Sequence, residues 1–173
     1  MNHSVYKNGQ ICTNSWTIFA RNEVDFEQGD HLFDFGDFLA LAEQGALPSS
    51  AQVRLAVKVN VGDEVEKLGP WLEKLSMIAV DFPAFSDGRG FSSARLLREQ
   101  LGYKGEIRAT GHYILDQISL MQRCGIDSFL LENPHLQAAL EKGHLNEVRL
   151  YTQPAIGSES KAQNARPWLR KAN

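Results

Sequence analysis

Residues 77–132 read "MIAVDFPAFSDGRGFSSARLLREQLGYKGEIRATGHYILDQISLMQRCGIDSFLLE", and short apolar segments alternate with longer amphipathic ones along them. Three segments have the length and composition of buried strands: "MIAVDF", "GEIRATG" and "DSFLLE". The two segments between them, "FSSARLLREQLG" and "HYILDQISLMQRCG", repeat apolar residues at helical intervals and end in glycine. Strands that alternate with single helix-length segments predict βα units and a mostly parallel sheet.

The same alternation continues on both sides of this stretch. A strand-like run, "VRLAVKV", precedes a helical pattern in which Pro70 predicts a break, and "NPHLQAALEKG" has Asn133 as a helix cap. The strands are predicted near residues 53–59, 77–82, 106–110, 127–131 and 148–152. We therefore expect an α/β fold with a mostly parallel open sheet of about five strands, or an incomplete barrel-like array. Five strands are too few for a closed eight-stranded barrel.

The N-terminal residues predict a β-hairpin, because β-prone runs flank Asn8-Gly9, a pair typical of a type I′ turn. We expect this hairpin at an edge of the sheet or over one end of it. Residues 22–37 hold six acidic side chains and no lysine or arginine, and they are expected to lead into a short helix that ends at Gly45.

Composition and charge set the class of protein. A chain of 173 residues that is 43% hydrophobic fits one α/β domain over residues 1–153, followed by a basic, flexible C-terminal tail over residues 154–173. The tail has a charge of +3 and the rest of the chain −6. An acidic body argues against binding of nucleic acid, and no apolar run is long enough to span a membrane. Two separated cysteines and no secretory signal predict a cytoplasmic protein.

The segment "DGRG", residues 87–90, is the richest candidate for a ligand site. Ligands of parallel α/β sheets bind outside the carboxyl ends of the strands, and this segment follows the second predicted strand. Gly88 and Gly90 let backbone N–H groups approach a ligand, and Arg89 offers a fork of donors to an oxyanion. Ser92 and Ser93, at the start of the next predicted helix, complete the expected anion-binding set.

A structural interpretation of this segment stays open beside the anion site. A tight turn needs glycine, a helix start favours serine, and an arginine in a turn often pairs with a nearby aspartate such as Asp81 or Asp87. A dinucleotide site of the Rossmann kind is not favoured, because the next strand ends in Thr110 and Gly111 without an acidic residue.

Other positions at the predicted strand ends could take part in catalysis. The same rule selects Asn60, Thr110 to His112, Glu132-Asn133 and Gln153. Asp81, Asp87 and His112 are candidates for acid–base roles, although His112 fits a surface or helix-capping position equally well. No metal site is expected, since His31, Asp34 and Asp37 fit a solvated acidic face better than a ligand set. Cys124, in the last turn of a helix, fits a small buried hydrophobe.

Three motifs resemble a bacterial family of unknown function, the domain-of-unknown-function 934 (DUF934) proteins. They are "DFPAFSDGRGFS" at residues 81–92, "GYKGEIRA" at residues 102–109 and "DQISLMQRCGID" at residues 116–127, and "VYKNGQICTNSWT" is similar as well. Family members are labelled as oxidoreductases of sulfite reduction, because their genes lie beside a sulfite reductase gene. The resemblance therefore implies sulfite reductase as the partner and assimilatory sulfite reduction as the process.

The cysteine count limits what this chain does in that process. Sulfite reductases use siroheme and an iron–sulfur cluster that takes four cysteine ligands, and two separated cysteines do not supply them. We expect neither group in this chain, and its cofactor, if any, is left open. The favoured hypothesis is an accessory protein that binds the reductase or delivers electrons or substrate, with a small-anion site formed by Gly88, Arg89, Gly90, Ser92 and Ser93. The alternative is a small oxidoreductase or other enzyme acting on an anionic sulfur metabolite.

Overall fold

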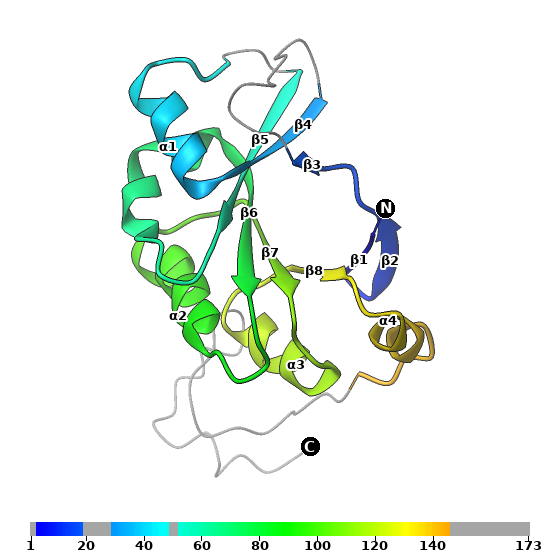
Figure 1. Cartoon of the computed structure of the whole chain (residues 1–173). Helices are drawn as coiled ribbons and strands as arrows, with labels where there is room; N and C mark the ends of the chain where they lie inside the picture. The colour runs from blue at the N-terminus through cyan, green and yellow to red at the C-terminus, as the bar shows by residue number, and fades with distance from the viewer. Residues whose placement is uncertain (1–2, 19–28, 49–51, 146–173) are drawn as a thin grey trace, which may run out of the picture.

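A computed structural model describes residues 3–18, 29–48 and 52–145 of the chain (Figure 1). Eight strands form one curled sheet in the order β2-β1-β8-β7-β6-β5-β4-β3. None of the helices in the described ranges combines the length and the apolar character that a membrane span requires. The strands are β1 (Ser4–Lys7), β2 (Gln10–Thr13), β3 (Thr17–Ile18), β4 (Gly29–Asp34), β5 (Val53–Val59), β6 (Leu75–Phe82), β7 (Glu106–Gly111) and β8 (Ser128–Leu131).

Four helical segments connect the parallel strands from β4 to β8, and a fifth, α4, follows β8. They are α1 (Phe35–Glu43), the 3₁₀ helix η1 (Val65–Lys74), α2 (Arg89–Arg95), which continues as the π-helical turn η2 (Leu96–Gln100), α3 (Leu115–Arg123) and α4 (Pro134–Glu141). Pro70 lies inside η1, where the sequence predicts a break, and the side chain of Asn133 accepts a hydrogen bond from the N–H of His135 as the cap of α4. The expected stop at Gly45 has a φ of 67°.

The sheet confirms the mostly parallel α/β prediction and corrects its strand number. Strands β3 to β8 pair in parallel, each with the next along the chain, whereas β1 pairs antiparallel with both β2 and β8. The prediction of about five strands is wrong because the hairpin joins the same sheet edge to edge with β8, and because β3 and β4 extend the other edge. Strand β4 lies in the acidic segment, where charged residues interrupt the apolar pattern that would predict a strand. The strand predicted at 148–152 and the tail lie outside the described residues.

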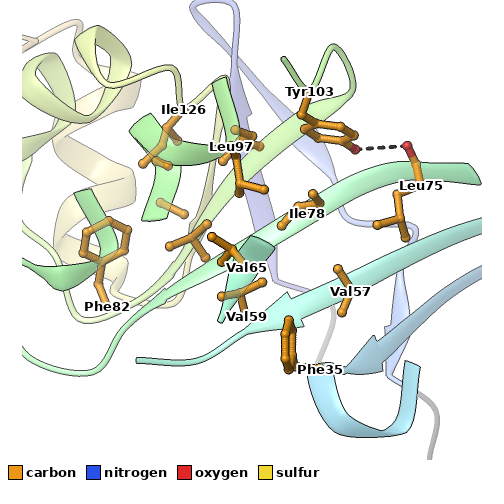
Figure 2. Packing of buried hydrophobic residues seen from close by; sticks show 14 of the residues in the cluster. Phe35, Val57, Val59, Val65, Leu75, Ile78, Phe82, Leu97, Tyr103 and Ile126 are labelled. Atoms are coloured by element: carbon orange, nitrogen blue, oxygen red, sulfur yellow. Dashed lines mark hydrogen bonds between the residues drawn. The ribbon is translucent and has the colours of Figure 1, made fainter. Parts of the chain in front are cut away.

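All four connecting helical segments lie on one side of the sheet (Figure 1). A right-handed crossover fixes the side on which each helix packs, and every crossover here steps in the same direction along the sheet. Alternate residues of the strands therefore face the helices and form the main hydrophobic core. Figure 2 shows this core, in which the Tyr103 hydroxyl donates a hydrogen bond to the Leu75 carbonyl at 3.0 Å.

The curl of the sheet follows from the short link between its two edges. Strand β2 ends at Thr13 and β3 begins at Thr17. Four Cα–Cα steps span at most about 14 Å, whereas the edges of a flat eight-stranded sheet lie roughly 34 Å apart. The sheet is therefore bent into an open barrel, and the incomplete barrel-like array expected from the sequence describes it better than a flat sheet.

The link covers part of the concave face of this barrel. Trp16 packs on a small apolar cluster of Leu32, Ala56, Met77 and Ala79, and the guanidinium of Arg54 lies 5.1 Å from the centre of the Trp16 ring. Asn14 accepts a hydrogen bond of 2.8 Å from Arg108.

A charged network fills the rest of the concave face near β7. Glu106 contacts Lys7, Arg108 and Ser128, and the Arg108–Glu106 ion pair is 2.6 Å long. Burial acts to raise the pKa of Glu106, but the hydrogen bonds from Lys7 and Ser128 and the charge of Arg108 outweigh it and lower the pKa to about 2. The carboxylate thus stays charged far into the acid range.

This lowered pKa predicts how stability depends on pH. The folded-state pKa of Glu106 lies below its ordinary value of 4.5, so its contribution is complete above pH 4.5 and is lost as the pH falls toward 2. We expect the Glu106→Gln protein to be less stable than the wild type at pH 7. As the pH falls from 4.5 toward 2, the wild type should lose up to about 3 kcal/mol more unfolding free energy than Glu106→Gln. Urea unfolding at several pH values measures the difference. The Glu99→Gln protein, changed at an exposed helical site, should follow the wild type; an acid profile of Glu106→Gln parallel to the wild type contradicts the prediction.

Candidate functional site

Polar side chains of three neighbouring strands meet at the carboxyl edge of the sheet, on its concave face. Lys58 comes from β5, Asp81 from β6 and Thr110 from β7. Asp81 and Thr110 are direct partners in the β6–β7 register. The Lys58 ammonium lies 3.3 Å from Oδ1 of Asp81, and the Thr110 hydroxyl lies 3.2 Å from the same oxygen. This Lys58–Asp81–Thr110 set is called the strand-end triad below.

The triad leaves one carboxylate oxygen of Asp81 for a ligand. Both contacts are made to Oδ1, and within the described part of the chain no hydrogen bond reaches Oδ2. The side chain of Asp81 is 17% exposed and that of Lys58 is 31% exposed. The carboxylate is therefore held in place from one side and reachable from the other.

Gly111 fixes the backbone beside the triad. Its φ is 88°, and a Cβ at this position would lie 2.6 Å from the carbonyl oxygen of Phe82. The next residue, His112, donates its backbone N–H to that carbonyl at 2.6 Å. The ends of β6 and β7 are thus tied together, and His112 leaves the sheet at the edge where the triad lies.

The triad lines a pocket of about 390 Å³, which we call the polar pocket. Glu132, which follows β8, and His112 lie at its exposed rim. A volume of this size is at the lower end of the range for small-molecule sites. The residues around it are Ile18, Leu32, Lys58, Asp81, Pro83, Thr110, Gly111, His112, Leu130 and Glu132.

The segment 87–90 is held by contacts of its own. The carboxylate of Asp87 accepts two hydrogen bonds from the Arg89 guanidinium, at 3.0 and 2.7 Å, and a third from the backbone N–H of Arg89 at 3.1 Å. The hydrogen bonds from Arg89 lower the pKa of Asp87, and those to Asp87 raise the pKa of Arg89. This pairing is the one named in the structural interpretation, and an anion would have to compete with Asp87 for the guanidinium.

The two glycines and two serines of this segment have different surroundings. Gly88 has a φ of −84° and open space where a Cβ would lie. Gly90 lies against the ring of Phe82, and a Cβ there would come within 2.7 Å of it. Helix α2 begins at Arg89, so Ser92 and Ser93 lie within its first turns rather than at its cap, and Ser93 donates to the Arg89 carbonyl at 3.4 Å. Anion binding by residues 88–93 stays a prediction.

The structure brings together only some of the residues predicted from the sequence. Asp81 and His112 line the polar pocket, as do Thr110 and Glu132 from the strand-end positions, whereas Asp87 lies apart in its own loop. Lys58 was missed, because the strand-end rule selects Asn60. A signal was present in "VRLAVKV", where the only two charged residues, Arg54 and Lys58, are four apart and so share the face opposite the core.

The remaining candidates lie in the core or near it. His31 is 2% exposed, and its ring stacks on that of Phe33 with 6.3 Å between centres. Cys124 is buried, as expected, and desolvation raises the pKa of its thiol. Within the described ranges, no group of three or more His, Cys, Asp or Glu side chains is arranged to hold a metal ion.

Comparison with known proteins gives a family and no activity. The family model described as "Bacterial protein of unknown function (DUF934)" matches residues 56–162, more than half of the chain. The match includes all three residues of the strand-end triad and residues 87–93, and it does not reach the N-terminal hairpin. No curated protein matches the chain.

The packing of residues 88 and 90 predicts opposite effects of the same substitution. The Gly90→Ala protein should lose about 1–3 kcal/mol of unfolding free energy, because the new Cβ would overlap the Phe82 ring. The Gly88→Ala protein should be as stable as the wild type or up to about 1 kcal/mol more stable, because its φ suits alanine and the space is open. Urea unfolding of both proteins measures the contrast, and equal losses at the two positions contradict it.

Proposed function

The chain belongs to the bacterial family of unknown function DUF934, and we propose that it is a small cytoplasmic enzyme that acts on an anionic sulfur metabolite by acid–base chemistry. The observation that carries the chemistry is the strand-end triad, in which a lysine and a threonine hold one oxygen of an aspartate at the wall of a pocket. The link to sulfur rests on the resemblance to proteins labelled as acting in sulfite reduction.

The geometry supports removal of a proton from the ligand. The free Oδ2 of Asp81 takes the proton from an acidic C–H group, the carboxylate becomes a carboxylic acid, and the C–H electron pair stays on the substrate. The Lys58 ammonium, 3.3 Å from the other oxygen of Asp81, stabilises the negative charge that forms. His112, at the rim of the same pocket, is a second group able to exchange a proton with the ligand.

The charges of the polar pocket favour a singly charged substrate. Lys58 is matched by Asp81 and opposed by Glu132 at the rim, so these three side chains have a formal charge of −1 and only Lys58 attracts an anion. Two carboxylates repel a dianion more strongly than a monoanion. An organic sulfonate or sulfinate fits this balance better than a doubly charged oxyanion.

This proposal takes the enzyme alternative ahead of the accessory hypothesis for a physical reason. The sequence alone favours the accessory hypothesis, because it contains no convincing acid–base or nucleophilic pair and offers a basic docking element. Lys58 and Asp81 are 23 positions apart and become a pair only when β5 and β6 lie side by side. The ground for preferring a purely accessory role is thereby weakened.

Exchange of carbon-bound hydrogen tests the proposed step. Sulfonates and sulfinates with a C–H group next to a carbonyl are incubated with the protein in D₂O, and loss of the C–H signal is followed by NMR. We expect Asp81→Asn to slow exchange by about 10²- to 10⁴-fold, and Lys58→Met to weaken ligand binding by about 10- to 100-fold. Melting curves without ligand establish that both variants are folded.

The Arg89→Ala protein serves as the matched comparison, since it removes the cation of the other candidate anion site. Its exchange rate should equal that of the wild type. Exchange that depends on Arg89 and not on Lys58 or Asp81 places the site at residues 87–93 and overturns the proposal, as does exchange unaffected by Asp81→Asn.

An accessory role in assimilatory sulfite reduction is the second candidate, and the basic C-terminal segment favours it. Residues 154–173 contain four basic residues and one acidic residue, whereas the rest of the chain is acidic. The basic residues are Lys161, Arg166, Arg170 and Lys171, and the acidic one is Glu159. A cationic segment of this kind suits docking to a complementary partner such as sulfite reductase.

Neutralising this segment tests the second candidate. Replacing all four basic residues by glutamine should weaken binding to sulfite reductase, most strongly at low salt, where charge attraction is least screened. Binding is measured at low and at high salt with the full-length protein. An unchanged affinity at low salt contradicts docking by this segment.

A further inference from the structure

A second pocket, of about 420 Å³, adjoins the polar pocket at the carboxyl edge of the sheet. The two pockets share Gly111, His112, Leu130 and Glu132 in their walls. The second pocket, called the apolar pocket below, is lined mainly by apolar side chains: Phe85, Tyr113, Ile114, Leu130, Pro134 and Leu136. The two pockets therefore lie side by side, with ionisable groups in one and mainly apolar groups in the other.

Two of the apolar side chains are exposed, which is unusual for residues of this size. Phe85 is 59% exposed and Ile114 is 44% exposed. They come from different connections, Phe85 from the one after β6 and Ile114 from the one after β7. Both line the same pocket, so a ligand there would remove apolar surface from water on two sides.

The walls of the apolar pocket are fixed by hydrogen bonds. Gln117, in the first turn of α3, donates to the Phe85 carbonyl at 3.2 Å and accepts from the backbone N–H of Ile114 at 3.2 Å. One side chain thus joins the two connections that carry the exposed residues. The Tyr113 hydroxyl donates to the Leu130 carbonyl at 2.6 Å, which anchors its ring to β8. The pocket is built before a ligand arrives.

We propose that the substrate is amphipathic, with a small anionic head in the polar pocket and an apolar aliphatic or aromatic body in the apolar pocket. This inference rests on the proposed function, because it places the head beside Lys58. A single ligand is favoured because the two pockets adjoin at His112 and Leu130, so one molecule lying across these residues would reach both. Each part has a volume suited to a small group, and together they fit one extended molecule.

The n-alkyl sulfonates from methane- to octanesulfonate provide the test, because the head stays constant while the chain grows. Binding to the isotopically labelled full-length protein is measured by NMR titration. Once the chain is long enough to enter the apolar pocket, each further methylene should raise the affinity by about fourfold, until the pocket is full. Ile114→Ser should reduce this gain per methylene, since it removes apolar wall while leaving a residue suited to the N-cap of α3.

Leu120→Ser is the matched control. Leu120 lies on α3, is 46% exposed, much like Ile114, and is not part of either pocket. The gain per methylene in this variant should equal that of the wild type. An equal reduction in both variants shows that the chains bind to exposed apolar surface in general and overturns the proposal.

The outcomes separate this inference from the proposed function. Sulfonate binding that depends on Lys58 but does not grow with chain length overturns the amphipathic substrate and leaves the polar pocket standing. Affinity that grows with chain length but is unchanged in Lys58→Met overturns the single-ligand proposal, because the body then binds without the head. No binding of any member overturns both.

Discussion

The crossover from one parallel strand to the next through a helical segment, repeated four times in one direction from β4 to β8, is the constraint on which the rest of this structure depends. Each parallel strand from β4 to β8 is placed beside the one before it, so the helices have only one face of the sheet to cover. The other face then bends inward, and the residues 14–16 that join the two edges hold it bent. The carboxyl ends of β5 to β8 are brought to one side of this concave surface, where the two pockets lie.

A concave face of this kind can hold charges because each has a partner. Arg108 is 7% exposed, and it contacts Glu106, Ser128 and Asn14, which come from three different segments of the chain. Breaking one of these contacts would leave a buried charge unmatched, so the network fixes how the hairpin and the β2–β3 link meet β7. At the carboxyl edge the pattern changes, since Asp81 is held through Oδ1 only. The chain thus satisfies its charges inside the barrel and leaves a carboxylate oxygen available at its rim.

Local patterns predicted most of the elements and their mostly parallel arrangement, but not which side chains neighbouring strands bring together. The strand over residues 53–59, the type I′ turn at Asn8-Gly9 and the cap at Asn133 follow from short stretches of sequence, and the structure agrees with each. Strand β4 was missed because acidic residues interrupt its apolar pattern, and β3 has only two residues. Lys58 and Asp81 could not be paired, because their contact depends on the register between β5 and β6, which no local pattern encodes.

The glycines of this chain show why sequence alone drew attention to residues 87–90 rather than to Gly111. A glycine-rich turn suggests that a ligand approaches the backbone. In this protein the group close to Gly90 is the Phe82 ring, and no atom lies within 4 Å of where a Cβ of residue 88 would be. Gly111 stands alone in the sequence, yet its positive φ and its closeness to the Phe82 carbonyl allow β6 and β7 to meet beside Asp81. Gly90 thus serves packing within the protein. Gly111 instead lets the ends of β6 and β7 approach each other beside Asp81, whose carboxylate is hydrogen-bonded through one oxygen only. The strand-end triad is therefore the stronger candidate for the chemistry of this protein.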